Sequence, residues 1–258
     1  MKLDKNKIIS GISKDIEVVV LDQTDSTNDY FVDAQYASSP SICLAEQQLK
    51  GRGRVGRKWY SPYGCNIYLS LLYKFSNIHE ISSLSLVIGL AVREAITKIC
   101  NNDDDLFVKW PNDIFYKDKK LGGILIESKT LGEDIYVTAG IGINVNLAEE
   151  DVKIDTSWTS IKKITGRDQD RNQLVVEMVN NILSYYKNFQ KSGFEYFMNE
   201  WKEKDLLQGK QITLDQDSEK VEGLCKGVDD MGNLLLRLED GSLRSFNYGD
   251  TSILKHSS

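Results

Sequence analysis

Histidine is scarce in this sequence. The only two, His79 and His256, have no plausible nucleophile or metal ligand as a neighbour. A histidine-based catalytic triad or a histidine-rich metal site is therefore not expected. The cysteines also lack the paired spacing of a metal site: Cys43, Cys65, Cys100 and Cys225. We expect them to be free thiols in a reducing cytoplasm.

Long apolar runs and surplus positive charge are absent as well. No stretch approaches the length of a membrane span, and no apolar run near the N-terminus is long enough for a signal peptide. The 32 Lys and Arg residues face 38 Asp and Glu, which gives a net charge of -6. A dedicated nucleic-acid binder usually carries a basic excess. We therefore expect a cytoplasmic protein without a membrane or DNA partner.

The pattern of the first two hundred residues predicts an α+β domain. The hydrophobic share of 41% and the charged share of 27% are those of a globular protein. Apolar runs and alternation predict strands at 17–21, 41–46, 65–73, 120–127 and 135–146, with two short strand pieces on either side of Pro111. Helical spacing and capping residues predict helices at 28–37, 82–99, 157–165, 171–190 and 193–203, and we expect the last three to cover one face of the sheet.

The sequence changes character at Gly209. Short strands are expected at 211–214, 221–228, 234–238 and 243–246, with polar turns between them. This pattern is typical of a small SH3-like β-barrel. The predicted domains are therefore residues 1–208 and 209–258.

The most unusual stretch is 51–59, GRGRVGRKW, which alternates glycine with cationic residues. Glycines give backbone freedom and a bare surface that can lie against a ligand. Arginines carry donor forks suited to carboxylates and phosphates. We expect a flexible loop that closes over a small anionic molecule.

Two familiar phosphate motifs do not explain this loop. Gly51, Gly53 and Gly56 fit G-x-G-x-x-G, but a dinucleotide site requires these glycines to open a helix. Here they lead into Trp59 and a turn. A Walker loop is excluded because no Gly-Lys-Ser/Thr follows.

Three further segments break local rules. KWPND at 109–113 places an amide and a carboxylate side by side at a bend, where a plain structural turn is the alternative. Lys120 precedes two glycines on the next strand, where it could equally be a solvated strand end. Strand 140–146 is also rich in glycine. Such violations tend to gather at one functional site.

Together these segments resemble the signatures of biotin protein ligases. The segments GRGRVGRKW, KWPND, KLGGIL (120–125) and GIGIN (140–144) come in that family's order at comparable spacings, and Ser26–Asn28 and 249–252 match too. The resemblance covers about residues 17–255. It implies a mixed β-sheet flanked by helices, related to class II aminoacyl-tRNA synthetases, followed by the SH3-like domain.

The resemblance also implies an ATP-dependent reaction in two steps. Biotin and ATP give biotinyl-5′-AMP with the help of Mg²⁺, and a lysine of a biotin carboxyl carrier domain then takes the biotin. The family includes monomers and side-by-side dimers. Longer members carry an N-terminal DNA-binding domain, for which the 16 residues before the first strand are too few, so no DNA binding is expected.

The site residues implied by the resemblance fall into three overlapping groups. Catalytic roles fall to Arg52, Arg54, Asp113 and Lys120. Biotin contacts fall to Ser26, Thr27, Asn28, Gln48, Gly51, Arg52, Gly53, Arg54, Lys120, Gly123 and Gly140. ATP contacts fall to Arg54, Arg57, Lys58, Trp59, Asn112, Asp113, Lys120 and Asn144, with Asp113 as the magnesium ligand.

Other interpretations stay open at this point. A lipoate or octanoate ligase of the same superfamily would share much of the fold, although the Arg-rich loop argues against it. A non-enzymatic nucleic-acid-binding module built on that loop is disfavoured by the acidic net charge. A catalytically dead relative is disfavoured because the key positions are all occupied. The C-terminal 253–255 does not align cleanly with the family's usual ending, so any nucleotide contact from that domain is unassigned.

Overall fold

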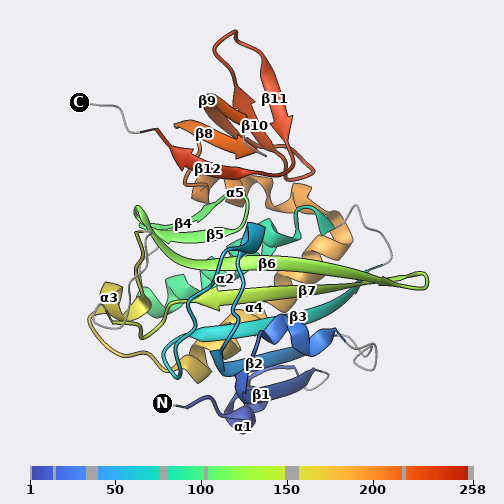
Figure 1. Ribbon diagram of the computed structural model, residues 1–258, viewed down its shortest axis with the longest axis vertical. Helices are drawn as coiled ribbons and strands as arrows, with labels where there is room; N and C mark the ends of the chain where they lie inside the picture. Colours follow the sequence, from blue (N-terminus) through green and yellow to red (C-terminus); the bar gives the residue numbers. More distant parts are fainter. Residues whose placement is uncertain are drawn as a thin grey trace.

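The computed structural model describes residues 2–13, 16–32, 40–75, 81–101, 104–148, 157–216 and 219–254. A seven-stranded mixed sheet forms its larger part (Figure 1). In spatial order the strands are β1 (Glu17–Thr24), β2 (Ser41–Gln48), β3 (Ile67–Phe75), β7 (Asp134–Ile143), β6 (Lys119–Leu131), β5 (Asp113–Tyr116) and β4 (Leu106–Lys109). β1 and β2 pair in parallel and every other neighbouring pair is antiparallel.

Two long helices cover one face of this sheet. α2 (Leu84–Cys100) and α4 (Arg171–Ser192) pack against each other, and α2 contacts β4 and β6. Both helices bury an apolar stripe, as their helical spacing predicts. The short α1 (Lys5–Gly11) packs on α4. The opposite face of the sheet is left for the glycine-rich loop, which crosses in front of it in Figure 1.

Three predicted helices differ from the structure. In the described part of the range 28–37 the chain forms a 3₁₀ turn, η1 (Thr27–Phe31), and residues 33–39 lie outside the described residues. The helix expected at 157–165 is reduced to α3 (Ile161–Thr165), because Trp158 forms an isolated parallel bridge with Lys120. The stretch 193–203 divides into η6 (Phe194–Phe197) and α5 (Met198–Lys204) after Gly193, whose φ is 65°.

The C-terminal part is a second, five-stranded antiparallel sheet that fits an SH3-like domain. Its order is β11 (Leu243–Phe246), β10 (Leu234–Arg237), β9 (Glu219–Val228), β8 (Gln211–Gln216) and β12 (Asp250–Ile253). The sequence did not predict β12, whose residues alternate too little to mark a strand. Gly209 donates its N–H to Cys225 of this sheet, and we propose the domain boundary immediately before it.

The two sheets are joined through the bend at 110–111. Trp110 is 2% exposed and its Nε1 donates to the Gly232 carbonyl at 3.0 Å. Thr251 Oγ1 donates to the Trp110 carbonyl at 3.0 Å. The hydrophobic core is continuous from α1 into the second sheet. Among the described helices, none has the length and apolarity to cross a membrane.

Candidate active site

The loop at 51–61 is an ordered hairpin-like turn. Trp59 N donates to Gly51 O at 2.9 Å, and Gly53 N donates to Arg57 O at 2.6 Å. Between these contacts Arg54–Gly56 form a 3₁₀ turn, with Val55 at φ 52° and 81% exposed. A β-branched residue is disfavoured at positive φ. Because backbone strain of this kind collects at functional sites, the turn itself points to a role for the loop.

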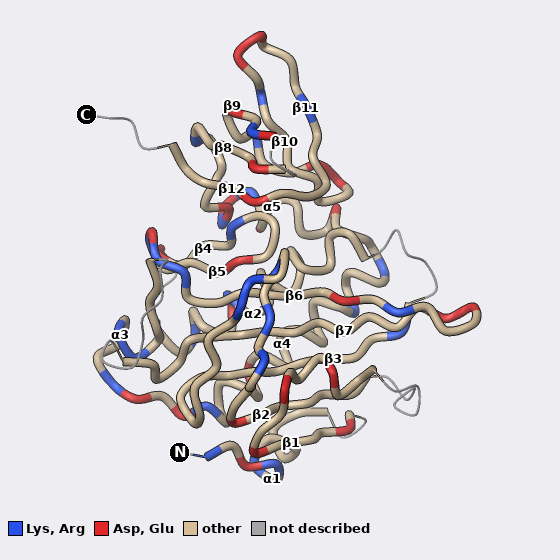
Figure 2. Tube along the Cα trace, in the orientation of Figure 1, with Lys and Arg blue, Asp and Glu red and all other residues tan. Residues whose placement is uncertain are grey.

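The arginines of this loop are paired with carboxylates on three different elements. Figure 2 shows the basic stretch crossing in front of the sheet. Arg52 donates from both Nη atoms to Asp29 of η1, at 2.7 and 2.9 Å, and lies 3.2 Å from Glu127 of β6. Its hydrogen bond to Asp29 raises the pKa of Arg52 above its usual value. Arg52 therefore ties the start of the loop to β6.

Arg54 and Arg57 point toward the second domain instead. Arg57 forms an ion pair with Asp250 at the start of β12. Arg54 Nη1 lies 3.3 Å from the Gly249 carbonyl, 3.5 Å from Asn112 Oδ1 and 3.8 Å from Asp250. Burial lowers the pKa of Arg54, and the charge of Asp250 partly offsets this. The second domain thus supplies acceptors to two arginines of the loop.

Another group of cationic side chains lies where β5, β6 and the bend at 110–111 meet. Lys120 Nζ is 2.7 Å from Asp113 Oδ1, and Gly123 lies directly beside this pair. Lys109 donates to the Thr251 carbonyl at 2.6 Å. Burial lowers the pKa of Lys109, with Asp113 acting in the opposite direction. Lys109 was not among the predicted site residues.

Neutral hydrogen-bonding groups lie on the other side of the loop. Thr27 N donates to Gln48 Oε1 at 2.9 Å, and Gln48 Nε2 donates to Ser61 Oγ at 3.1 Å. Gly51 packs so closely here that a Cβ on it would lie 3.1 Å from Gln48 Nε2. Ser26 is also buried, at 5% exposure. The structure therefore brings Thr27 and Gln48 into contact, and Ser26 directly precedes Thr27 in the chain.

Two strand glycines make room for side chains of this site. The Asn28 amide lies against Gly140 of β7, where a Cβ would collide with it. The Trp59 indole lies on Gly142, with Lys120 Nζ 5.6 Å from its ring centre. The sequence predicts that strand glycines mark places where a group approaches the backbone closely. At these two glycines the approaching groups are side chains of the protein itself.

The remaining predicted residues are placed as follows. Asn112 Nδ2 donates to Ile124 O at 2.6 Å. This contact fits the alternative given above for the 109–113 segment, a plain structural turn. Asn144 is 5% exposed and donates to Thr159 O at 3.1 Å, so it holds the 157–160 segment against β7. Gly53 faces Arg57, and Lys58 is exposed at the far side of the hairpin.

Besides Lys109, named above, four polar residues of the site were missed by the sequence reasoning. They are Asp29, Ser70, Glu127 and Asp250. Ser70 carried a usable signal, because it is a polar residue in an otherwise apolar strand, and it is 0% exposed. The others became visible only when the fold placed them beside cations.

The side chains offer little to a metal by themselves. Among the described residues, no three His, Cys, Asp or Glu side chains gather as a metal site. Mg²⁺ commonly takes one or two protein carboxylates and completes its shell with phosphates and water. Asp113, next to two lysines that would attract phosphates, fits that limited role.

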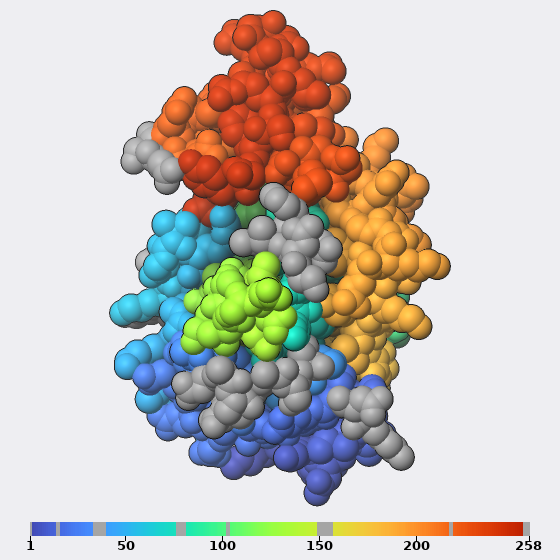
Figure 3. Space-filling model, turned by 90° about the vertical axis from the view of Figure 1, so that its right-hand side faces the viewer, coloured from blue at the N-terminus to red at the C-terminus, as the bar shows by residue number. Residues whose placement is uncertain are grey.

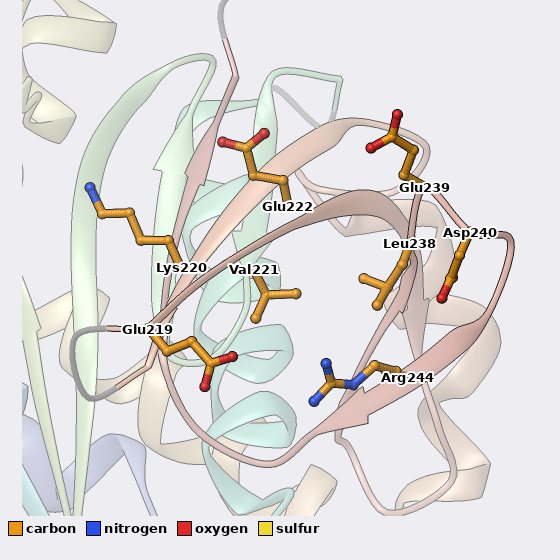
Figure 4. A pocket seen from close by; sticks show the side chains of 8 residues that line it. All are labelled: Glu219, Lys220, Val221, Glu222, Leu238, Glu239, Asp240 and Arg244. Carbon is orange, nitrogen blue, oxygen red and sulfur yellow. The ribbon is translucent and has the colours of Figure 1, made fainter.

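A cavity of about 580 Å³ lies elsewhere, on the second domain (Figure 4). It is lined by Glu219, Lys220, Val221, Glu222, Leu238, Glu239, Asp240 and Arg244. These side chains come from the ends of β9, β10 and β11 and mix both charges. None of them contacts the loop, so this cavity is separate from the site.

Comparison with known proteins decides the family. Residues 20–146 match the Biotin/lipoate A/B protein ligase family, and residues 208–254 match the Biotin protein ligase C terminal domain. The bifunctional ligase/repressor BirA of Salmonella typhimurium is 35% identical over 97% of this chain and 78% of its own length. This chain belongs to the biotin protein ligase family.

Solved structures agree with this assignment. The biotin protein ligase from Aquifex aeolicus in complex with biotin and ATP is 31% identical, with a TM-score of 0.78 over 93% of this chain and 99% of that one. The biotin--[acetyl-CoA-carboxylase] ligase of Paracoccus denitrificans is 30% identical over 84% of this chain and 93% of its own length. The predicted mixed sheet, the SH3-like domain and the ligase class of this biotin protein ligase are thereby confirmed.

Proposed function

We propose that this ligase activates biotin with ATP and transfers it to a lysine of a biotin carboxyl carrier domain. In the first step the biotin carboxylate attacks the α-phosphorus, and the bond to the leaving pyrophosphate breaks. In the second step the lysine amine attacks the carbonyl of biotinyl-5′-AMP, and AMP leaves. One observation carries the proposal: a single loop lies over both a set of cationic side chains and a set of neutral hydrogen-bonding side chains.

The first step brings two anions together, which fixed cations make feasible. Arg52 and Lys120 are assigned to the biotin carboxylate and the α-phosphate, Arg54 to retention of the adenylate, and Arg57 and Lys58 to the outer phosphates. Each charge-assisted hydrogen bond is worth about 1.5–3 kcal/mol. Loss of one of these cations should therefore cost one to two decades in rate or affinity.

The carboxylates now paired with these cations must exchange for ligand anions. Asp29 and Glu127 hold Arg52, Asp250 holds Arg57, and Asp113 holds Lys120. Mg²⁺, when bound with the nucleotide, would neutralise phosphate charge, and Asp113 is the residue that would hold it. Lys120, freed from its pair with Asp113, would face the α-phosphate.

The neutral groups suit the head of biotin. A cyclic urea carries no charge, so it needs neutral donors and acceptors, which Ser26, Thr27 and Gln48 supply. Asn28, Gly51 and Gly53 complete this side, and Gly123 and Gly140 are assigned to clear space for the bicyclic ring and its tail. Trp59, Asn112 and Asn144 are assigned to the nucleotide side.

The test is ATP–pyrophosphate exchange with biotin and with lipoate as the acid. We expect exchange with biotin, followed by biotin transfer to a purified carrier domain and not to one whose acceptor lysine is replaced by arginine. Exchange with lipoate alone would instead assign the chain to the lipoate side of the superfamily.

A further inference from the structure

The turn that joins β4 to β5 carries Lys109 and Asp113 at its two ends, where they pair across it. Every carbonyl from residue 109 to residue 112 accepts a hydrogen bond. Lys109 O accepts from Asn112 N at 3.1 Å, Trp110 O from Thr251 Oγ1 at 3.0 Å, Pro111 O from Ser85 Oγ at 2.9 Å and Asn112 O from Ile124 N at 2.9 Å. The turn is therefore held from β12, α2 and β6 at once.

The indole of Trp110 adds another contact to the second domain. Its Nε1 donates to the Gly232 carbonyl at 3.0 Å, and Trp110 is 2% exposed. A buried donor that loses its acceptor is costly, because water cannot take the acceptor's place. The position of Trp110 therefore depends on where Gly232 presents its carbonyl.

Gly232 is packed against the start of α2. Its φ is 80°, and a Cβ on it would lie 2.8 Å from Ser83 Cβ and 3.0 Å from Leu86 Cδ1. A side chain here would be strained and would also collide with the helix. The neighbouring Met231 carbonyl accepts from Ser82 Oγ at 3.2 Å. These contacts seat the turn of the second domain on the helix.

Asp229 determines the shape of this second turn. Its Oδ1 accepts from Met231 N at 3.0 Å and from Asn233 N at 2.8 Å. Its Oδ2 accepts from Asn233 Nδ2 and from Ser245 Oγ of β11, both at 3.0 Å. The backbone of Asp229 donates to Asn233 O and accepts from Gly232 N. One side chain thus closes the turn and ties it to β11.

We propose that Asp229 is a positioning residue for the nucleotide side of the site. It holds the Gly232 carbonyl in place, that carbonyl holds the Trp110 indole, and the indole fixes the turn that carries Lys109 and Asp113. Among the described residues, the hydrogen bonds of Asp229 all lie within the second domain, so its effect on the site passes through Trp110. The inference rests on the proposed function and adds a residue that acts on ATP binding without touching the nucleotide.

The two substrates should respond differently to a displaced turn. The groups assigned to the head of biotin lie on η1 and β2, and β3, β7 and β6 separate β2 from β5. A displaced turn should therefore weaken ATP binding much more than biotin binding. A variant that lost only stability would contain less active protein and would leave the KM for ATP unchanged.

The experiment measures the KM for ATP in biotin-dependent ATP–pyrophosphate exchange on the full chain, in a double-mutant cycle. Trp110→Phe keeps the buried ring and removes the indole N–H, and Asp229→Ala releases the second turn. We expect each change to raise the KM for ATP roughly fivefold, the worth of one neutral hydrogen bond. The double variant should also stay near fivefold, because both changes break the same chain of contacts. Biotin affinity, measured by calorimetry, should change less than about twofold throughout.

Asp240→Ala is the matched control. Asp240 holds the β10–β11 turn of the same domain in the same way, by accepting from Ser242 N at 2.9 Å and from Ser242 Oγ at 2.6 Å. Its described hydrogen bonds do not reach Trp110, so the KM for ATP should equal that of the parent.

Two further variants guard against a folding defect in Asp229→Ala. Asp229→Asn keeps an oxygen for the N–H groups of Met231 and Asn233, and its KM for ATP should lie within about twofold of the parent's. Asp229→Ser can still accept from one of these N–H groups. It takes the place of Asp229→Ala in the cycle if the alanine variant does not fold.

The outcomes separate the two proposals. The inference is overturned if the parent exchanges with biotin and loss of the Asp229 carboxylate leaves the KM for ATP unchanged. It is equally overturned if that loss multiplies the effect of Trp110→Phe, or weakens biotin binding as much as ATP binding. If the parent itself shows no exchange with biotin, the proposed function fails and the inference falls with it.

Discussion

Arg54 is the most enclosed arginine of the loop. Its side chain is 23% exposed, against 38% for Arg52 and 62% for Arg57. It is also the one that contacts both Asn112 and the Gly249 carbonyl. A cation in this position can hold an acyl adenylate between the loop and the bend while the loop excludes water.

We expect Arg54→Gly to release biotinyl-AMP before transfer. The freed adenylate would label lysines of bystander proteins, and the amount should exceed that from the parent by about tenfold, the worth of one charged contact. The measurement is biotin on added serum albumin with no carrier present, per adenylate formed. Arg57→Gly, on the exposed side of the loop, is the control and should leak less. Equal bystander labelling by parent and Arg54→Gly would contradict the assignment.

Asp205 is a buried carboxyl at the junction of the two sheets. It is 6% exposed, and Oδ1 accepts from Leu207 N at 2.9 Å. Burial raises its pKa from 3.8 to about 6. Because the folded-state pKa is the higher one, its contribution to stability is complete below the unfolded value and is lost as pH rises through about 6.

Asp205→Asn should remove this pH dependence. The unfolding free energy of the variant minus that of the parent should rise by on the order of 2–3 kcal/mol between pH 4 and pH 7.5. Urea unfolding at several pH values measures it. Glu203→Gln, on the exposed side of α5, should show no such trend. A difference that stays flat with pH would show that Asp205 is not the titrating group.

At the scale of elements, a buried ion pair joins β2 to α4. Arg171 Nη2 lies 2.7 Å from Glu46 Oε2, and both side chains are 1% exposed. Glu46 also accepts from Leu3 N at 2.6 Å, and Arg171 donates to Asn66 O at 3.0 Å. The pair therefore holds three segments against α4: the N-terminal segment, β2, which ends in Gln48, and the segment after the loop.

Breaking this pair on one side should be costly. Arg171→Met leaves Glu46 charged and buried, and we expect a loss of about 3–5 kcal/mol in unfolding free energy. Adding Glu46→Leu should recover most of that loss, since a buried pair is often replaceable by apolar residues. Chemical denaturation of both variants tests this. If the double variant is as unstable as Arg171→Met, the loss comes from packing and not from an uncompensated charge.

The sequence was sufficient for elements whose own residues define them. β3, β6 and β7 follow from β-branched and apolar runs, and α2 and α4 from their helical spacing. The sequence was not sufficient where tertiary contacts decide the local structure. Trp158 is extended because it pairs beside Lys120, and β12 exists because β8 offers it an edge. The site shows the same limit: the loop was evident, but Glu127 and Asp250 became site residues only through the fold.

At the scale of the whole molecule, the two domains meet at the arginines of the loop and at Lys109. Figure 3 shows the C-terminal residues in red stacked above the sheet, with residues near 50 on one flank. The turn that opens β12 supplies the Gly249 carbonyl to Arg54, the Asp250 carboxylate to Arg57 and the Thr251 carbonyl to Lys109. Three acceptors of one domain thus satisfy three cations of the other.

This arrangement has a consequence for nucleotide binding. Phosphates and Asp250 are anions that compete for the same arginines. The Asp250 side chain is 32% exposed and that of Arg57 62%, so their ion pair adds at most about 1 kcal/mol to stability. Removing the carboxylate should therefore strengthen phosphate binding more than it lowers the stability of the fold.

We expect Asp250→Asn to lower the KM for ATP by roughly threefold and to change the KM for biotin less, because of the residues assigned to biotin Arg54 alone lies near Asp250. The asparagine keeps the shape and the start of the strand, so the domains should stay joined. Asp240→Asn is the control: it removes one negative charge from the same domain, far from the loop, and should change neither constant. Since both variants alter the net charge equally, a lower KM for Asp250→Asn alone reflects the local pair and not long-range attraction. A KM for ATP that rises in Asp250→Asn would mean that the carboxylate holds the arginines in their binding geometry rather than competing for them.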